Sequence, residues 1–318
     1  MNALTLAAGQ TASLAAFAPR VLEYARAGRS ENTVRGYKSD WADFAEWCNA
    51  SGLNALPALA ETVASYLVCR ADEGLKAGTI QRRVSAIAAN HTAAGFENPA
   101  LKAAVRLTLA GIRRTIGTHQ QGKTPILTAD IAAMLSYIPG TLLGKRNRAL
   151  ILLGFAGALR RSELVGIDVD DVTFTEEGAR LMIRKSKTDQ EGNGQTIGIA
   201  FGNALCPVRA LRDWLTAAAI TSGPVFRSVN RHGGVQDGRL TDQVVASVVK
   251  AAAKTAGLDP ANFAGHSLRA GLVTQAAING VQERAIMKQT RHKSSDMLRR
   301  YIRDASLFRD NASARVGL

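Results

Sequence analysis

Apolar side chains recur every three or four positions through most of the N-terminal third of the chain, the spacing of one helical face. The pattern predicts four helices, which begin near Ser30, Pro57, Thr79 and Pro99. The aromatic positions of the first helix keep the same spacing, so we expect them to be core rather than ligand contacts. The N-terminal third is therefore predicted to be a helical domain.

The pattern breaks at residues 118–126, which are polar, contain Gly122 and Pro125, and lack an apolar period. Beyond them, residues 146–158 are apolar nearly throughout, as in a buried helix. Residues 180–186 and 195–200 alternate around a turn-forming stretch, which predicts a β-hairpin, the one clear β signal. Further helices are expected at 207–214, 241–257, 266–279, 282–289 and 294–303. The predicted fold is mainly α with a small antiparallel β-hairpin or sheet, in two domains at 1–117 and 127–318 joined by a linker at 118–126.

The net charge of the chain indicates what kind of partner it binds. The 318 residues carry a formal net charge of +14 and a pI of about 10.2, which favours a polyanionic partner such as DNA or RNA. Residues 76–123 hold eight basic side chains against one acidic, Glu97, so this segment is the better candidate for a phosphate-facing surface. Six of its side chains are the candidate DNA contacts: Lys76, Arg82, Arg83, Arg106, Arg113 and Arg114.

The three cysteines, Cys48, Cys69 and Cys206, show no metal-binding spacing and suit a reducing compartment. No apolar run approaches the ~18 residues that span a bilayer. There is also no Gly-rich phosphate loop and no clustered acidic triad for two metal ions. We therefore expect no metal, no other cofactor and no membrane contact.

A charged triplet follows the apolar helix directly, in Leu159-Arg160-Arg161-Ser162-Glu163. Glu163 lies three residues beyond Arg160, so on a helix it could orient that guanidinium toward a phosphate. Arg161 is the alternative clamp. On the hairpin, Lys187 could protonate a leaving oxygen, and Lys185 could replace it if the hairpin register slips by two residues.

Near the C-terminus, His266 and Arg269 are three residues apart at a predicted helix start, a favourable position for an anion. His292 and Tyr301 follow at offsets of 23 and 32 from Arg269. A tyrosine flanked by arginines is an unusual core residue, and a phenol can displace an alkoxide from a phosphodiester when cations hold the phosphate. Each of these residues alone has an ordinary structural explanation, but the ordered set does not.

The ordered set resembles the tyrosine recombinase (phage integrase) family over about 127–303, and the helical N-terminal part is compatible with that family's core-binding domain. The resemblance implies a 3′-phosphotyrosyl intermediate formed by Tyr301. It implies phosphate clamps at Arg160 and Arg269, a general acid at Lys187, and a proton acceptor or phosphate contact at His266. His292 would donate a hydrogen bond to a non-bridging oxygen, and Glu163 would support the site from behind.

The same resemblance implies a site-specific recombinase that exchanges strands between two duplexes without metal or ATP. Its partners would be double-stranded DNA with an inverted-repeat site and further copies of the chain, as a monomer or dimer on one site and a homotetramer in the synapse. A cytoplasmic, nucleoid-associated protein of bacterial or mobile-element origin is expected. The alternatives are a type IB topoisomerase-like or telomere-resolvase enzyme, or a DNA-binding protein with a decayed site.

The tail after Tyr301 carries Leu307 and Phe308 as apolar anchors, and the resemblance implies that it docks on a neighbouring protomer. Deleting residues 306–318 should leave duplex binding intact and reduce synapsis, measured by gel shift and by recombination of two-site DNA. Unchanged recombination by the truncated protein would contradict docking in trans.

Overall fold

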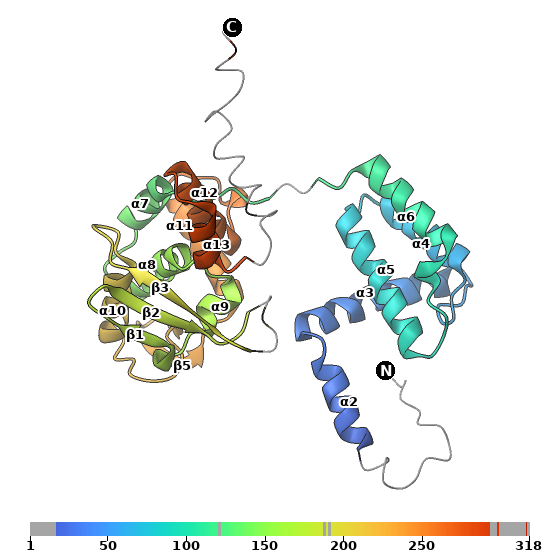
Figure 1. The fold of residues 1–318 in the computed structure, drawn as a ribbon, viewed down its shortest axis with the longest axis horizontal. Helices are drawn as coiled ribbons and strands as arrows, with labels where there is room; N and C mark the ends of the chain where they lie inside the picture. Colours follow the sequence, from blue (N-terminus) through green and yellow to red (C-terminus); the bar gives the residue numbers. More distant parts are fainter. Residues whose placement is uncertain are drawn as a thin grey trace. The chain divides into compact units, whose positions relative to one another are not determined.

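The computed structural model describes residues 17–119, 122–186, 189, 192–292, 298 and 316, and it divides into two compact units, 1–121 and 122–318. Figure 1 shows the elements of each unit. The predicted tail anchors and the helix expected at 294–303 lie outside the described residues, Leu298 excepted.

Unit 1 is all helical over its described residues. Its elements are α2 (Ala18–Ala27), α3 (Glu31–Ala50), α4 (Ala60–Asp72), α5 (Ala77–Ala93), the 3-10 turn η1 (Pro99–Leu101) and α6 (Ala103–Ile116). Ser30 caps α3 by accepting the Thr33 N–H at 3.3 Å, as a serine before a helix should. The four predicted helices are all present.

The aromatic face of α3 forms the core of unit 1. Phe44 is fully buried and meets Tyr66 of α4 edge-on, with ring centroids 5.0 Å apart. Trp41 and Trp47 pack against the same cluster, together with buried Ile80 of α5. The prediction that these rings are core is confirmed.

Unit 2 combines helices with two small antiparallel sheets. Its helices are α7 (Thr128–Ser136), α8 (Leu142–Ala156), α9 (Arg161–Gly166), α10 (Pro207–Ala217), α11 (Asp242–Thr255), α12 (Gly265–Ile278) and α13 (Glu283–Thr290), with 3-10 turns η2 (Val169–Asp171) and η3 (Pro260–Asn262). Its strands are β1 (Val172–Phe174), β2 (Gly178–Ile183), β3 (Gln195–Ala200), β4 (Arg227–Val229) and β5 (Val235–Arg239).

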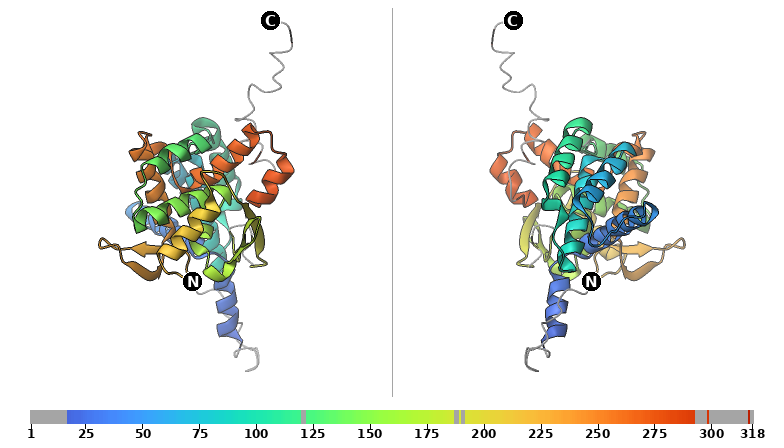
Figure 2. Two further views of the ribbon diagram at one scale, coloured as in Figure 1. Left: turned by 90° about the vertical axis from the view of Figure 1, so that its left-hand side faces the viewer. Right: turned by 90° about the vertical axis from the view of Figure 1, so that its right-hand side faces the viewer.

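The predicted hairpin is β2–β3, antiparallel in a register that pairs Gly178 with Ala200 and Ile183 with Gln195. Two further β features, β1 on the outer edge of β2 and the β4–β5 hairpin, were not predicted. Figure 2 shows β4–β5 projecting from the body of unit 2. Strand β5 is largely exposed and polar, so it lacks the alternation that a half-buried strand would have.

Helix α8 lies at the centre of unit 2, where it contacts α7, α9, α10, α11 and α12 (Figure 1). It begins at Leu142 rather than at 146 because Thr141 caps it, accepting the Gly144 N–H at 3.2 Å. It ends at Ala156 rather than at 158, and Ala158 already has a left-handed conformation. Its buried residues 149–154 make it the rigid support from which the following charged segment leaves.

A close backbone approach fixes α12 against the start of unit 2. The Ile126 N–H donates to the Ser267 carbonyl at 3.1 Å. A Cβ at Gly271 would lie 1.9 Å from the Ile126 carbonyl oxygen, so no side chain fits there. This contact holds the helix that carries His266 and Arg269.

Gly271→Ala should therefore destabilise the protein by about 1–3 kcal/mol through overpacking, measured by chemical denaturation. Gly166→Ala is the control, because an added Cβ there would meet no atom within 4 Å outside its own stretch of helix. Equal stabilities for the two variants would contradict the close-approach argument.

Candidate active site

The site begins where α8 ends and the chain turns into α9. Ala158 adopts a left-handed conformation with φ 46°, which reverses the chain directly before the charged triplet. Arg160 is the N-cap of α9, and its N–H donates to Glu163 Oε2 at 2.9 Å. The reversal frees the Ala158 carbonyl to accept a hydrogen bond from another element.

Glu163 bridges two guanidinium groups. Its side chain is only 1% exposed; Oε1 accepts from Arg160 Nη1 at 2.6 Å and Oε2 accepts from Arg291 Nη2 at 2.7 Å. Burial by itself raises the pKa of Glu163, but the charge of Arg291 and the hydrogen bonds and charge of Arg160 outweigh it, and the net shift is downward. Glu163 is therefore an ionised carboxylate at neutral pH.

Arg269 is a buried arginine on α12, 2% exposed. Its Nη1 donates to the Ala158 carbonyl at 2.6 Å, and its Nη2 donates to the Thr290 carbonyl. The guanidinium is thus fixed between the end of α8 and the end of α13. His266, three residues earlier on α12, is exposed.

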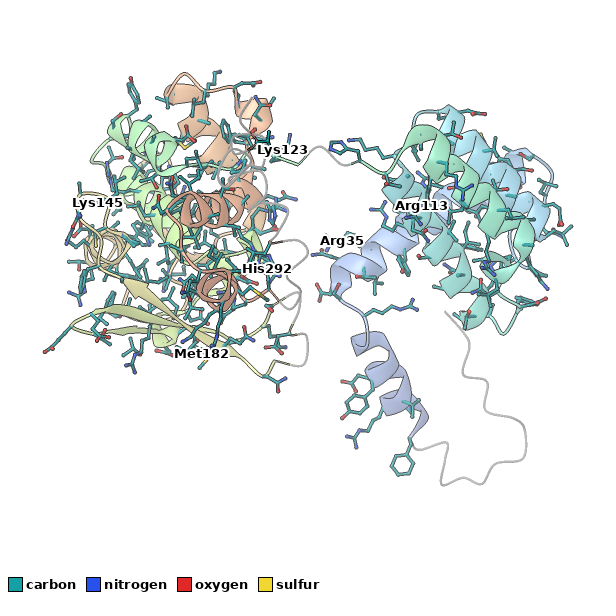
Figure 3. All side chains as sticks on the ribbon, turned by 45° about the horizontal axis from the view of Figure 1, so that its top comes forward. Arg35, Arg113, Lys123, Lys145, Met182 and His292 are labelled. Atoms are coloured by element: carbon teal, nitrogen blue, oxygen red, sulfur yellow. The ribbon has the colours of Figure 1, made fainter. Side chains whose placement is uncertain are left out.

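His292 follows α13 and is half-buried, at the place labelled in Figure 3. Its Nδ1 lies 2.7 Å from Thr290 Oγ1. Burial lowers the pKa of His292, and the positive charges of Arg269, Arg160, His266 and Arg291 lower it further, to about 4. The four groups therefore lie close enough to act on His292 electrostatically, and the lowered pKa leaves its imidazole neutral at neutral pH.

The structure thus brings together five of the predicted site residues, Arg160, Glu163, His266, Arg269 and His292. The two others, Lys187 and Tyr301, lie outside the described residues. Next to Lys187 in sequence, Ser186 exchanges two backbone hydrogen bonds with Asp189, each 3.1 Å long. The choice between Lys185 and Lys187 stays a prediction.

The two candidate clamps, Arg160 and Arg161, have different surroundings in the structure. Arg161 Nη2 lies 3.5 Å from Asp242 Oδ2 of α11, and its side chain is 43% exposed. Its methylene groups also cover Gly265, where an added Cβ would lie 2.5 Å from them. Arg160, by contrast, is held by Glu163 and lies close enough to His292 to lower its pKa, which favours Arg160 as the phosphate ligand.

Two residues of this cluster had no role in the sequence-based prediction. Thr290 contacts both Arg269 and His292, and Arg291 pairs with Glu163. Their position directly before His292 was visible in the sequence, but nothing in residue type or spacing indicated a carboxylate partner 128 positions away.

The predicted DNA contacts of unit 1 fall into two groups. Arg82 pairs with buried Asp40 at 2.7 Å, and Arg83 pairs with Asp43 and contacts Tyr66. Because these two guanidiniums already have carboxylate partners, they are the weaker candidates.

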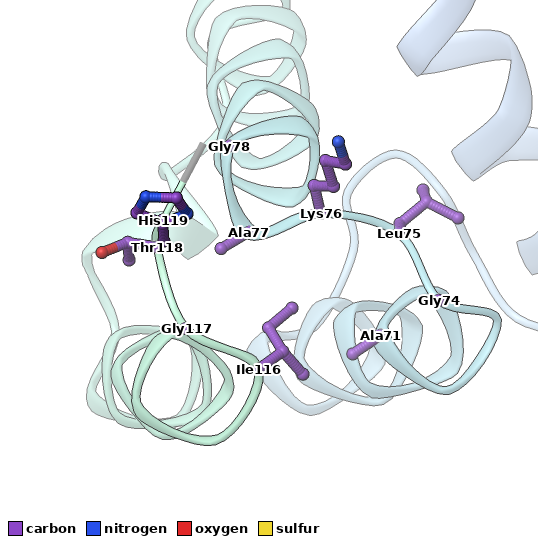
Figure 4. Close-up of a pocket in the computed structure, with 10 residues that line it drawn as sticks. All are labelled: Ala71, Gly74, Leu75, Lys76, Ala77, Gly78, Ile116, Gly117, Thr118 and His119. Carbon is purple, nitrogen blue, oxygen red and sulfur yellow. The ribbon is translucent and has the colours of Figure 1, made fainter. Parts of the chain in front are cut away.

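The other four side chains, Lys76, Arg106, Arg113 and Arg114, are exposed, and Arg113 is labelled in Figure 3. Lys76 lines an open pocket of about 250 Å³ between the start of α5 and the end of α6 (Figure 4). These four remain the better candidates for phosphate contacts.

Two family models match this chain, one in its N-terminal part and one in its C-terminal part. The phage integrase family model matches residues 126–307, and the N-terminal SAM-like domain of phage integrases matches residues 22–95. An integrase/recombinase xerD homolog of Selenomonas ruminantium is 45% identical over 294 residues, covering 91% of this chain and 86% of the relative. The recombinase cre of Escherichia phage P1 is 24% identical, covering 86% of this chain and 84% of that protein.

Two solved structures have the same fold. The Tn1549 transposon integrase in complex with transposon right end DNA superposes with a TM-score of 0.64 at 17% identity, over 90% of this chain and 92% of that one. A λ integrase dimer bound to a COC′ core site gives 0.60 at 18% identity, over 90% and 94%. The predicted fold class is confirmed.

The chain belongs to the phage integrase family and is a tyrosine-type site-specific recombinase, which confirms the prediction made from the ordered motif. Within the described residues, no helix is long and apolar enough to cross a membrane. The same residues contain no group of three or more His, Cys, Asp or Glu placed to hold a metal ion.

The lowered pKa of His292 predicts a pH dependence of stability. The folded-state value of about 4 lies below the ordinary 6.5, so unfolding takes up a proton between them. Stability should therefore fall as the pH drops through that window. Uptake of one full proton on unfolding changes the free energy of unfolding by about 1.4 kcal/mol per pH unit. Because His292 is only half-buried, we expect its contribution to be a fraction of that slope.

His292→Gln should flatten this slope in denaturant unfolding between pH 6.5 and 4. His232→Gln, at an exposed histidine between β4 and β5, is the control and should keep the wild-type slope. An unchanged slope in His292→Gln would contradict a half-buried, neutral imidazole in the folded state.

Proposed function

We propose that the cluster around Glu163 binds the scissile phosphodiester of duplex DNA and that Tyr301 attacks its phosphorus. The bond between Tyr301 Oη and phosphorus forms as the bond to the 5′-oxygen breaks, leaving a 3′-phosphotyrosyl link and a free 5′-hydroxyl. The observation that carries the proposal is the hydrogen-bonded cluster in which Glu163 holds Arg160 and Thr290 contacts both Arg269 and His292, an arrangement of donors that suits an anion.

The two clamps would act on the non-bridging oxygens, where negative charge grows in the pentacovalent transition state. Arg160 is held by Glu163, and Arg269 by two carbonyl oxygens, so neither guanidinium has to reorganise during the reaction. Two donors fixed before the substrate arrives stabilise the transition state more than two mobile ones would.

His292 would donate from Nε2 to a non-bridging oxygen. The neutral ring carries one proton, so this role requires the Thr290 hydroxyl to donate to Nδ1. The same hydroxyl also lies 2.8 Å from the Ile286 carbonyl, which competes for its proton. Substrate phosphate would favour the Nε2–H tautomer.

Proton transfer completes the step. Lys187 would give a proton to the departing 5′-oxygen, and His266 would accept the phenol proton of Tyr301 or share the phosphate. The phosphotyrosyl link conserves the energy of the broken bond, so a 5′-hydroxyl from a second strand can reverse the step. The balance of bonds requires neither ATP nor a metal ion.

We also propose the assembly. The chain would bind an inverted-repeat site as a monomer or dimer and pair two sites as a homotetramer in the cytoplasm. An apolar recess of about 400 Å³ in unit 2, lined by residues that include Leu152, Phe155, Leu205 and Leu272, is our candidate receptor for a neighbour's tail. Its lining and the apolar anchors Leu307 and Phe308 are complementary in character.

A nicked suicide duplex, carrying the site found by footprinting, tests the reaction. Wild-type protein should accumulate a covalent adduct, and Tyr301→Phe should form none, whereas Tyr137→Phe, at an exposed tyrosine of unit 2, should behave as wild type. Arg160→Lys should slow cleavage about 100-fold or more because a point charge cannot replace the fork, while Arg161→Lys changes it less than about threefold.

An adduct formed by Tyr301→Phe would contradict the nucleophile assignment, and equal losses in the two lysine variants would contradict the choice of clamp. Relaxation of supercoiled plasmid lacking the site would instead indicate topoisomerase activity.

A further inference from the structure

Arg291 occupies a backbone conformation that favours glycine. It follows α13 as the C-cap with φ 57° and ψ 38°, the left-handed region in which helices commonly end on a glycine. An arginine there is strained by its Cβ. A glycine would meet the backbone requirement without strain, so the side chain must contribute something that offsets it.

What the side chain contributes is a buried ion pair. The Arg291 side chain is only 3% exposed and donates to Glu163 Oε2 at 2.7 Å, while Oε1 of the same carboxylate accepts from Arg160. A single carboxylate shared by two arginines can sit in only a narrow range of orientations.

The pair joins two separate segments of the chain. Three consecutive residues, 289–291, make hydrogen bonds with the end of α8, with α12 and with α9 in turn. Gln289 donates to the Ala156 carbonyl at 2.9 Å, the Thr290 carbonyl accepts from Arg269, and Arg291 reaches Glu163. His292 is the next residue, and its ring contacts the Thr290 hydroxyl.

We infer that Arg291 is a positioning residue for strand cleavage, which acts through Glu163 to fix the Arg160 guanidinium and to hold His292 beside it. The inference rests on the proposed phosphate site and adds a member to it. Arg291 would touch neither DNA nor Tyr301, because its side chain is buried and paired with the buried Glu163. Its effect would appear in the rate of cleavage and not in the affinity for duplex.

Arg291→Gly separates this role from the backbone, since glycine suits φ 57°. We expect adduct formation on the suicide duplex to slow about 10- to 100-fold, as when a reacting group is misplaced by about 1 Å. Duplex affinity should stay near wild type because no phosphate contact is lost. Arg291→Lys keeps the positive charge but lacks the two-pronged guanidinium, so its rate of adduct formation should lie between those of wild type and Arg291→Gly.

The pH profile gives a second readout that a purely structural role would not move. Without Arg291, Glu163 loses the strongest charge that opposes its burial, so its pKa should rise. The acid side of the rate profile of Arg291→Gly should therefore move to higher pH. Ala219→Gly, at an exposed left-handed residue after α10 with φ 50°, controls for relief of strain and should keep the wild-type profile.

Combination with Glu163→Gln tests the path of the effect. If Arg291 acts through Glu163, the double variant should cleave no more slowly than the slower single variant. Fully additive losses, a wild-type rate and pH profile in Arg291→Gly, or a rate loss that only follows a loss of folded protein in thermal unfolding would each overturn the inference. These outcomes leave the wild-type adduct in place, whereas its absence would overturn the proposed cleavage chemistry together with this inference.

Discussion

The arrangement of the site depends on one buried carboxylate. Glu163 is nearly inaccessible to water, and it is tolerated there only because Arg160 and Arg291 supply two hydrogen-bonded positive charges. Removing one partner of such a pair typically costs about 3–5 kcal/mol, since it leaves a buried charge uncompensated. The carboxylate also accepts the Arg160 N–H, so the same residue caps α9 and orients the arginine side chain.

The other side chains of the cluster are positioned by the helices that pack around α8. The apolar α8 delivers the chain to a left-handed reversal at Ala158, whose carbonyl receives Arg269. The close approach of Gly271 to Ile126 fixes the helix that carries Arg269. Burial, together with the positive groups near it, lowers the pKa of His292, so its ring is neutral at neutral pH and can donate a hydrogen bond to phosphate only from the nitrogen that keeps its proton. The packing of the helices in unit 2 therefore determines where the charged groups of the site lie.

The sequence predicted most of the helices because their apolar period is strong; residues 266–279 were expected where α12 runs from Gly265 to Ile278. It did not predict β4–β5, whose exposed polar residues carry no alternation. At the site, the ordered motif predicted Arg160, Glu163, His266, Arg269 and His292, and the structure brings these five together. Arg291 could not be found in this way, because its role follows from a backbone angle and a partner 128 residues away.

Charge counting along the chain had a similar limit in unit 1. Arg82 and Arg83 belong to a basic segment, yet Asp40 and Asp43 from α3, about forty positions earlier, neutralise them in the folded unit. The composition of a segment cannot reveal such pairing. Of the six predicted contacts, Lys76, Arg106, Arg113 and Arg114 therefore remain the better candidates for binding phosphate.

The central claim is that the carboxylate-held arginines and His292 form the binding site for the scissile phosphate. A crystal structure of the protein trapped on a nicked duplex tests it most directly. We predict a phosphorus atom bonded to Tyr301 Oη, with Arg160, Arg269 and His292 within hydrogen-bond distance of its non-bridging oxygens and Arg291 still paired with Glu163. A phosphate held away from these side chains, or bonded to another residue, would contradict the account.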